Sequence, residues 1–144
     1  MRNECKNIYK IARKNAGFTQ DEAAERLYIS TRSIADYESG KTIPPDDVVC
    51  RMIELYDAPW LGYQHLRYSS EVGKRYLPDI TLTDLARAVL RFQKEVRDID
   101  SIDKDMIDIA CDGEINDDEL DRWQQVRKEI DEMAGAALAI MFTK

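Results

Sequence analysis

Hydrophobic residues recur along the chain at three- and four-residue steps among polar and charged ones, which is the period of amphipathic helices. In the N-terminal half, glycine, proline and capping residues divide this pattern into five short segments. Helices are predicted over about residues 4–16, 19–27, 31–39, 45–56 and 59–68. The alternation typical of strands is rare, so the chain is predicted to be all-α.

Residues that favour helix ends mark the limits of the first three helices. Gly17 and Gly40 follow the first and third, where glycine commonly terminates a helix. Thr19 and Glu22 have the spacing of a capping box, and Ser30 is a favourable N-cap for the third helix. A capped helix, a tight turn and a second short helix are the pattern of a helix-turn-helix.

The second half has a different organisation. Residues 69–80 carry no continuous apolar stripe and are predicted to be a linker. Helices are predicted over residues 81–99 and 117–142, which carry strong apolar stripes, and a weaker helix over 102–110. The predicted organisation is a helix-turn-helix domain at 1–68, a linker at 69–80 and a helical region at 81–144.

The negative charge of the chain belongs to its second half. The formal net charge is −7. Residues 1–68 carry 10 Lys/Arg and 10 Asp/Glu, whereas residues 69–144 carry 11 and 18. The acidity of the whole argues against nucleic-acid binding, but residues 1–41 have 8 basic against 6 acidic side chains, which weakens that argument.

Several classes of protein are not indicated. No apolar run approaches the roughly 20 residues of a membrane span, and the N-terminus lacks the apolar core of a signal peptide. Cys5, Cys50 and Cys111 are far apart and lack CxxC spacing. We interpret them as reduced thiols of a cytoplasmic protein, not as disulfide or zinc-binding residues.

Residues 19–45, TQDEAAERLYISTRSIADYESGKTIPP, resemble the Cro/repressor type of helix-turn-helix, the XRE family. The resemblance extends from about Asn7 to Trp60. It implies a five-helix, lambda-repressor-like domain that binds double-stranded DNA through its third helix. The C-terminal half is not covered, and nothing in it resembles the β-rich protease domain of self-cleaving repressors.

The resemblance implies base-reading positions on the third helix. Ile34 and Tyr37 share one face and anchor the helix to the core, which leaves Thr31, Arg32 and Asp36 to face a major groove. Arginine can bind the O6 and N7 atoms of guanine, whereas Asp36 either accepts from a cytosine amine or orients Arg32. The alternative is that Arg32 is a solvated surface charge.

Contacts to DNA phosphates are implied at the start of the second helix and after the third. These positions are Gln20, Ser39, Lys41 and Thr42. The alternative interpretation is that they are ordinary cap and turn residues.

Three other positions concern the architecture of the domain. Arg13 and Glu38 match a pair that forms a structural ion pair in the family fold. Tyr28 is a departure, because it occupies a turn position where the family usually has glycine. In a left-handed conformation tyrosine costs about 1–2 kcal/mol. The alternatives are a strained turn and a remodelled one.

Residues 108–119, DIACDGEINDDE, superimpose on a calcium-loop pattern, but Ala110 offers no oxygen at the third position. In the alternative interpretation, Gly113 makes a turn, while Asn116 and Glu119 form a capping box for the last helix. We favour the alternative and predict neither a metal nor a cofactor.

No catalytic constellation emerges from the sequence. His65 is the only histidine, and we interpret it as a surface or packing residue near Trp60. There is no nucleophile–base pair and no phosphate-binding glycine loop, so we predict that the protein is not an enzyme.

Two functional hypotheses remain. In the first, the protein is a phage-like, prophage-type repressor that reads DNA as a homodimer, because half-sites about 34 Å apart require two heads. Its C-terminal helices would self-associate, although they could instead complete a monomeric core. In the second, it is an antitoxin-like module whose acidic C-terminal helices bind a partner protein.

Overall fold

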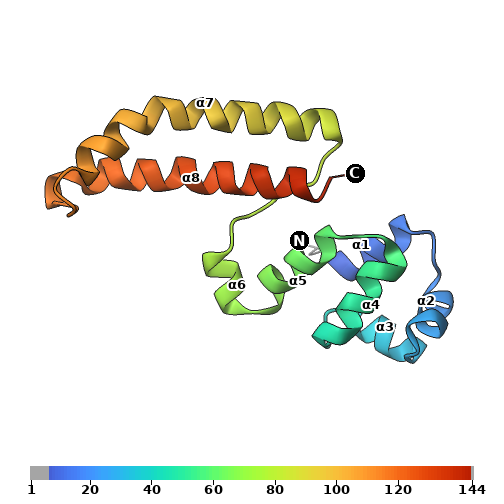
Figure 1. Cartoon of the computed structure of the whole chain (residues 1–144). Coiled ribbons are helices and arrows are strands. Elements are labelled where there is room, and N and C mark those ends of the chain that lie inside the picture. Colours follow the sequence, from blue (N-terminus) through green and yellow to red (C-terminus); the bar gives the residue numbers. More distant parts are fainter. Residues whose placement is uncertain (1–6, 144) are drawn as a thin grey trace, which may run out of the picture. The chain divides into compact units, whose positions relative to one another are not determined.

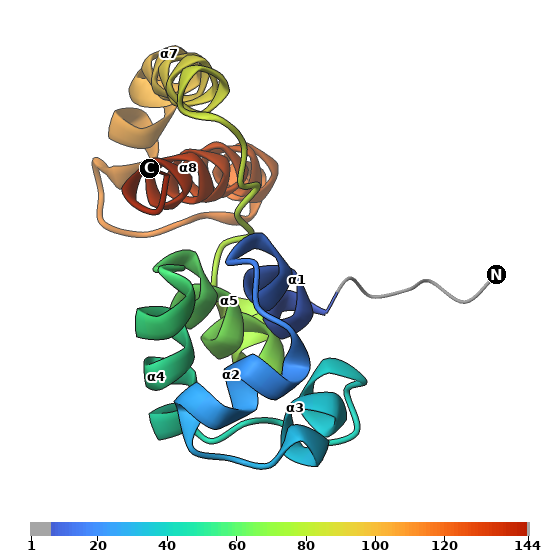
Figure 2. The same ribbon diagram turned by 90° about the vertical axis from the view of Figure 1, so that its right-hand side faces the viewer.

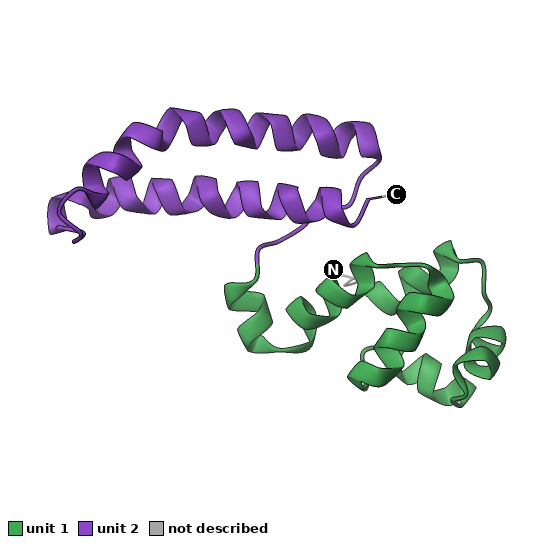
Figure 3. Cartoon of the chain, in the orientation of Figure 1, with its two compact units in different colours: residues 1–77 green, residues 78–144 purple. Residues whose placement is uncertain are grey.

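The computed structural model of the chain describes residues 7–143. These residues form eight α-helices and one short 3-10 helix, with no strand among them, so the all-α prediction is confirmed. The chain divides into two compact units, residues 1–77 (unit 1) and residues 78–144 (unit 2), which Figure 3 shows in different colours.

Unit 1 begins with a cluster of short helices joined by tight turns (Figure 1). Its helices are α1 (Ile8–Asn15), α2 (Gln20–Leu27), α3 (Thr31–Glu38), α4 (Asp46–Tyr56), α5 (Trp60–Ser69) and α6 (Glu71–Tyr76). The predicted capping box of α2 is present: the Thr19 hydroxyl accepts from the Glu22 N–H at 3.2 Å, and the Glu22 carboxylate accepts from the Thr19 N–H at 2.8 Å. Ser30 caps α3 by accepting from the Ser33 N–H.

The core of unit 1 draws buried apolar residues from α1 to α5, with three from α2, four from α4 and one from α3. Helix α2 packs against both α3 and α4, and α5 packs against α1 and α4, as Figure 2 shows in a second view. Leu27, Ile34, Met52 and Leu61 are each almost completely buried where these helices meet. Burying side chains of this size stabilises the fold by about 1.5–3 kcal/mol each, so α3 is held by its apolar face.

The segment predicted as a linker contains α6. Ser70 caps this helix by accepting from the Gly73 N–H at 3.0 Å, and Glu71 lies favourably in its first turn. The turn between α5 and α6 is tight, since a Cβ at Gly73 would lie 2.1 Å from the Leu66 carbonyl oxygen. The boundary between the two units falls after Leu77.

Unit 2 is a helical hairpin. Its helices are α7 (Leu85–Ala110), the 3-10 helix η1 (Asp117–Glu119) and α8 (Leu120–Met141), with α7 and α8 side by side in Figures 1 and 2. The prediction of two helices over 81–99 and 102–110 was wrong, because α7 is continuous. No glycine or proline lies between these segments to interrupt it, and it starts later, after the cap Asp84.

Both large and small apolar residues are buried in the hairpin. Ala88 and Ile109 of α7 are buried, as are Val126 and Ala136 of α8. Gly135 is buried as well, and a Cβ there would lie 2.3 Å from the Asp79 carbonyl oxygen. Gly135 therefore lets α8 pack closely against the chain segment that leads into the hairpin.

Candidate nucleic-acid interface

Helix α3 presents one buried and one solvent-facing side. Ile34 is 1% exposed and Glu38 is buried, whereas Thr31 and Arg32 at the start of the helix are exposed. Tyr37, the second predicted anchor, is half-buried and packs against the core. The first turn of α3 is therefore the part whose side chains are accessible to a ligand.

An ion-pair network fixes the end of α3. The guanidinium of Arg13 in α1 donates through Nε to Glu38 Oε1 at 2.5 Å and through Nη2 to Glu38 Oε2 at 2.9 Å. Its third donor reaches the Phe18 carbonyl oxygen at 2.6 Å, and Gln20 Nε2 donates to Glu38 Oε2 at 3.0 Å. The network joins α1, α2 and α3 through one buried carboxylate.

The pKa values of the pair follow from this geometry. Burial alone would raise the pKa of Glu38, but the hydrogen bonds from Arg13 and Gln20 outweigh it and hold that pKa below its usual range. The hydrogen bond to Glu38 raises the pKa of Arg13. Each partner of the pair thus favours the charged form of the other.

A second tie to α3 comes from Asn7, which the sequence analysis did not single out. Its side-chain oxygen caps α1 by accepting from the Tyr9 and Lys10 N–H groups at 3.0 Å. Its amide nitrogen donates to the Tyr37 carbonyl oxygen at 2.8 Å. One side chain thus starts α1 and holds the C-terminal end of α3.

The turn between α2 and α3 keeps a left-handed residue. Tyr28 has φ 56° and ψ 41°, and its side chain is 88% exposed. The turn has therefore not been remodelled around the missing glycine, and tyrosine accepts the strain. Arg51 of α4 braces the turn by donating to the Leu27 carbonyl oxygen at 2.6 Å. No local pattern in the sequence marks this contact.

The three predicted base-reading residues have different surroundings. Arg32 is exposed at the start of α3. The Thr31 hydroxyl donates to Asp21 Oδ1 at 2.8 Å. Asp36 is half-buried and pairs with Lys41 Nζ at 3.5 Å, so its partner in the structure is Lys41 and not Arg32, the partner suggested as one alternative.

The residues predicted to contact phosphates lie at the start of α2 and in the turn after α3. One N–H of the Gln20 side-chain amide donates to Glu38, so the second N–H of that amide is left for another acceptor. The Ser39 hydroxyl donates to the Asp36 carbonyl oxygen at 3.1 Å, and the backbone N–H groups of Lys41 and Thr42 donate to the same oxygen. The side chains of Lys41 and Thr42 are exposed at this turn.

His65 is a buried packing residue, 4% exposed. Its Nδ1 lies 2.7 Å from the Tyr9 hydroxyl and its Nε2 lies 3.0 Å from Asp46 Oδ1. Burial raises the pKa of Tyr9 to about 12. The imidazole of α5 therefore links the buried Tyr9 of α1 to the exposed Asp46 at the start of α4.

Residues 108–119, which match the calcium-loop pattern, form the end of a helix, a turn and a capping box. Its first residue, Asp108, lies within α7, so it is held in a helix and not in a loop. Asn116 and Glu119 form the expected capping box, with the Asn116 N–H donating to the Glu119 carboxylate at 3.0 Å. Gly113 makes the turn with φ 81°.

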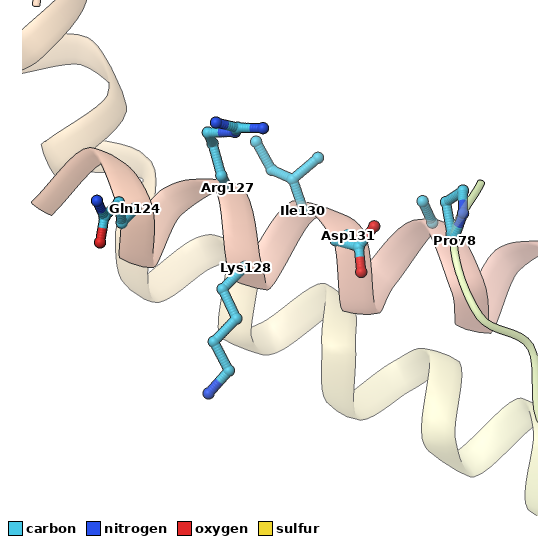
Figure 4. A pocket seen from close by; sticks show the side chains of 7 residues that line it. Pro78, Gln124, Arg127, Lys128, Ile130 and Asp131 are labelled. Carbon is cyan, nitrogen blue, oxygen red and sulfur yellow. The ribbon is translucent and has the colours of Figure 1, made fainter. Parts of the chain in front are cut away.

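A hollow of about 500 Å³ lies along α8, lined by Pro78, Gln124, Arg127, Lys128, Ile130, Asp131 and Ala134. Figure 4 shows Arg127 and Ile130 on one side of the helix and Lys128 on the opposite side. The charged groups do not converge on one point, so this hollow has no evident chemistry. Across the described residues, none of the helices has the length and apolar character to cross a membrane.

Two comparisons with known proteins found matches to helix-turn-helix proteins. A family model described as helix-turn-helix matches residues 10–61. The chain is similar to the HTH-type transcriptional regulator ImmR of Bacillus subtilis (strain 168), with 30% identity over 93 residues, which are 65% of this chain and 68% of that protein. No solved structure matches the chain significantly. The match to the family model spans α2, α3, α4 and most of α1, whereas Asn7, Tyr9 and His65 lie outside it.

Proposed function

Since the chain belongs to the Cro/repressor-type, or XRE, helix-turn-helix family of DNA-binding transcriptional regulators, we propose that it is a repressor that reads the major groove with α3. The observation that carries this proposal is the division of α3 into a buried face and an accessible first turn. Ile34 and Glu38 hold the helix, while Thr31 and Arg32 face solvent. An arginine so placed can donate two hydrogen bonds to guanine.

Positioning on the DNA is assigned to residues beside α3. Lys41 and Thr42 follow the helix and are exposed, so they can reach the phosphate backbone on one side. The N-terminus of α2 and the second amide donor of Gln20 serve the other side. Asp36 offsets part of the charge of Lys41, which makes it a modulator of this contact.

We assign unit 2 to self-association, so that the two copies of unit 1 in a dimer bind two half-sites of the DNA. The hairpin leaves several large apolar side chains open to solvent. They are Leu82, Leu85, Val89, Leu90, Ile107, Ile130 and Met141. A second copy of the hairpin would cover such residues and remove apolar area from water.

The proposal is tested by binding of the purified protein to DNA that flanks its own gene, at two salt concentrations, with the mass in solution measured in parallel. We expect a dimer that binds tightly and loses affinity as salt rises. Leu90→Ser should weaken the dimer, whereas Leu66→Ser, at an exposed leucine of unit 1, is the control. A monomer that does not bind this DNA would contradict the proposal.

The acidity of the second half favours a second candidate function. The whole excess of negative charge lies in residues 69–144, which suits a basic protein partner better than DNA. In this antitoxin-like function the hairpin binds the partner and the head regulates its own gene. Two results would favour this candidate over the dimer. A basic protein would co-purify with the full chain but not with a chain that lacks the hairpin, and the free chain would have a monomeric mass.

A further inference from the structure

Three glutamates of the hairpin bring their oxygen atoms together. Glu95 lies on α7, and Glu129 and Glu132 lie three residues apart on α8, hence on one side of that helix. One carboxylate oxygen from each residue lies within 4.8 Å of the other two. The two helices lie side by side in Figure 1, and the cluster joins one to the other.

Glu95 is the unusual member of this cluster. It is 5% exposed, and its Oε2 atom is buried without a hydrogen-bond partner among the described residues. Lys94 Nζ lies 3.5 Å from the other oxygen, but the same amine is 2.6 Å from Asp98 Oδ2 and its side chain is 65% exposed. An unsatisfied buried carboxylate oxygen destabilises a fold unless a cation or a donor reaches it.

The two glutamates of α8 retain capacity to bind a ligand. Glu129 Oε1 accepts from Gln125 at 2.5 Å, and Glu132 Oε1 lies 3.9 Å from Lys128 Nζ. Each ionised carboxylate offers about four lone-pair sites, so one such contact does not saturate it. Both residues are half-buried, which leaves a path for an ion and for water.

We propose that Glu95, Glu129 and Glu132 bind one hard divalent cation, Mg²⁺ or Mn²⁺, that links α7 to α8. The donor set is all oxygen, without the imidazole or thiolate groups that favour zinc. Three carboxylates from two helices leave room for the water ligands that Mg²⁺ retains in proteins. The ion would satisfy Glu95 Oε2 and remove the repulsion among three neighbouring negative charges.

The test uses the full chain and Mn²⁺ as the probe, after treatment with a chelator. Bound Mn²⁺ is counted by electron paramagnetic resonance, and thermal unfolding of the hairpin is followed through Trp123 in a Trp60→Phe background. We expect one Mn²⁺ per chain, competition by Mg²⁺, and a hairpin that melts at higher temperature with either ion.

Glu95→Gln keeps the size of the side chain and removes its charge. It should weaken Mn²⁺ binding by about tenfold or more and abolish the stabilisation by metal. Glu129→Gln provides a second variant on the other helix, should the first not fold. Glu114→Gln removes an equal charge at an exposed loop position and should bind Mn²⁺ as the wild type does. The absence of bound Mn²⁺, or equal binding by Glu95→Gln and Glu114→Gln, would overturn the proposal.

Discussion

Arg13 in α1 and Glu38 at the end of α3 form a buried, two-pronged ion pair across 25 residues of chain. Removing one partner of such a pair leaves the other charge buried and uncompensated. We expect Arg13→Met to lower the free energy of unfolding of unit 1 by about 3–5 kcal/mol. Urea denaturation followed through Trp60, in a Trp123→Phe background, measures this value.

The matched control for Arg13→Met is Lys14→Met, at an exposed neighbouring position. It should change the stability by no more than about 0.5 kcal/mol. Adding Glu38→Met to Arg13→Met should recover part of the loss, since two apolar residues leave no unpaired charge. If Arg13→Met is no more harmful than Lys14→Met, the pair does not hold α3 in place.

Tyr28 offers a stabilising substitution. Its left-handed backbone is costly for tyrosine, and its exposed side chain contributes little packing. Tyr28→Gly should raise the free energy of unfolding by about 0.5–1 kcal/mol, after allowance for the greater flexibility of glycine in the unfolded chain. Tyr28→Ala keeps the strain and should give no gain in the same urea titration. A gain of equal size in both variants would place the effect in the side chain and not in the backbone.

The local features of the DNA-binding unit were predictable from the sequence. Thr19 and Glu22, and likewise Ser30, lie next to the backbone groups that they cap, so their roles follow from spacing alone. The buried side of α3 was predicted from the spacing of Ile34 and Tyr37. The family resemblance then predicted which residues lie on its exposed side. These signals depend on neighbours within a few residues.

Contacts between distant segments were not predictable in this way. Asn7 reaches Tyr37 across 30 residues, and Arg51 reaches Leu27 across 24. Both hydrogen bonds are accepted by backbone carbonyl groups. Every residue has such a group, so the residue type at the acceptor position does not predict the bond. The clustering of Glu95 with α8 is equally hidden, because its register depends on how the hairpin packs.

High pH should destabilise unit 1 through two buried tyrosines. Burial raises the pKa of both Tyr9 and Tyr56 to about 12, from the ordinary value near 10. A pKa raised by folding means that the unfolded chain loses these protons first. The stability they contribute is therefore fully present below pH 10 and is lost as the pH rises from 10 to 12.

Urea midpoints between pH 9 and 12 measure this loss. In Tyr9→Phe one of the two phenol groups is absent, so the free energy of unfolding should fall less steeply over this range. The variant should be less stable at pH 9, because it lacks the hydrogen bond to His65. Tyr28→Phe makes the same change at an exposed position and is the matched control. A slope in Tyr9→Phe equal to that of the wild type would exclude Tyr9 as a source of the alkaline loss.

Arg32 and Lys41 should affect DNA binding in different ways, because one is assigned to a base and the other to a phosphate. Arg32→Ala should weaken binding to the cognate site by about 1–3 kcal/mol and reduce discrimination against a base change at the contacted position. Lys41→Ala should weaken binding to all sequences alike and lower the dependence of log K on log salt by about 1.

Titrations of the cognate and the altered site at several salt concentrations separate the two roles. Arg97→Ala removes an equal charge from an exposed position of unit 2 and is the control for both variants. Arg32→Ala could instead lose the same affinity for both sites and show a smaller salt slope. That result would mean that Arg32 contacts the DNA backbone and not a base. A base contact must distinguish sequences, whereas a phosphate contact responds to counterions. The direct reading of bases would then fall to Thr31 and Asp36, whose bonds to Asp21 and Lys41 would have to open on binding.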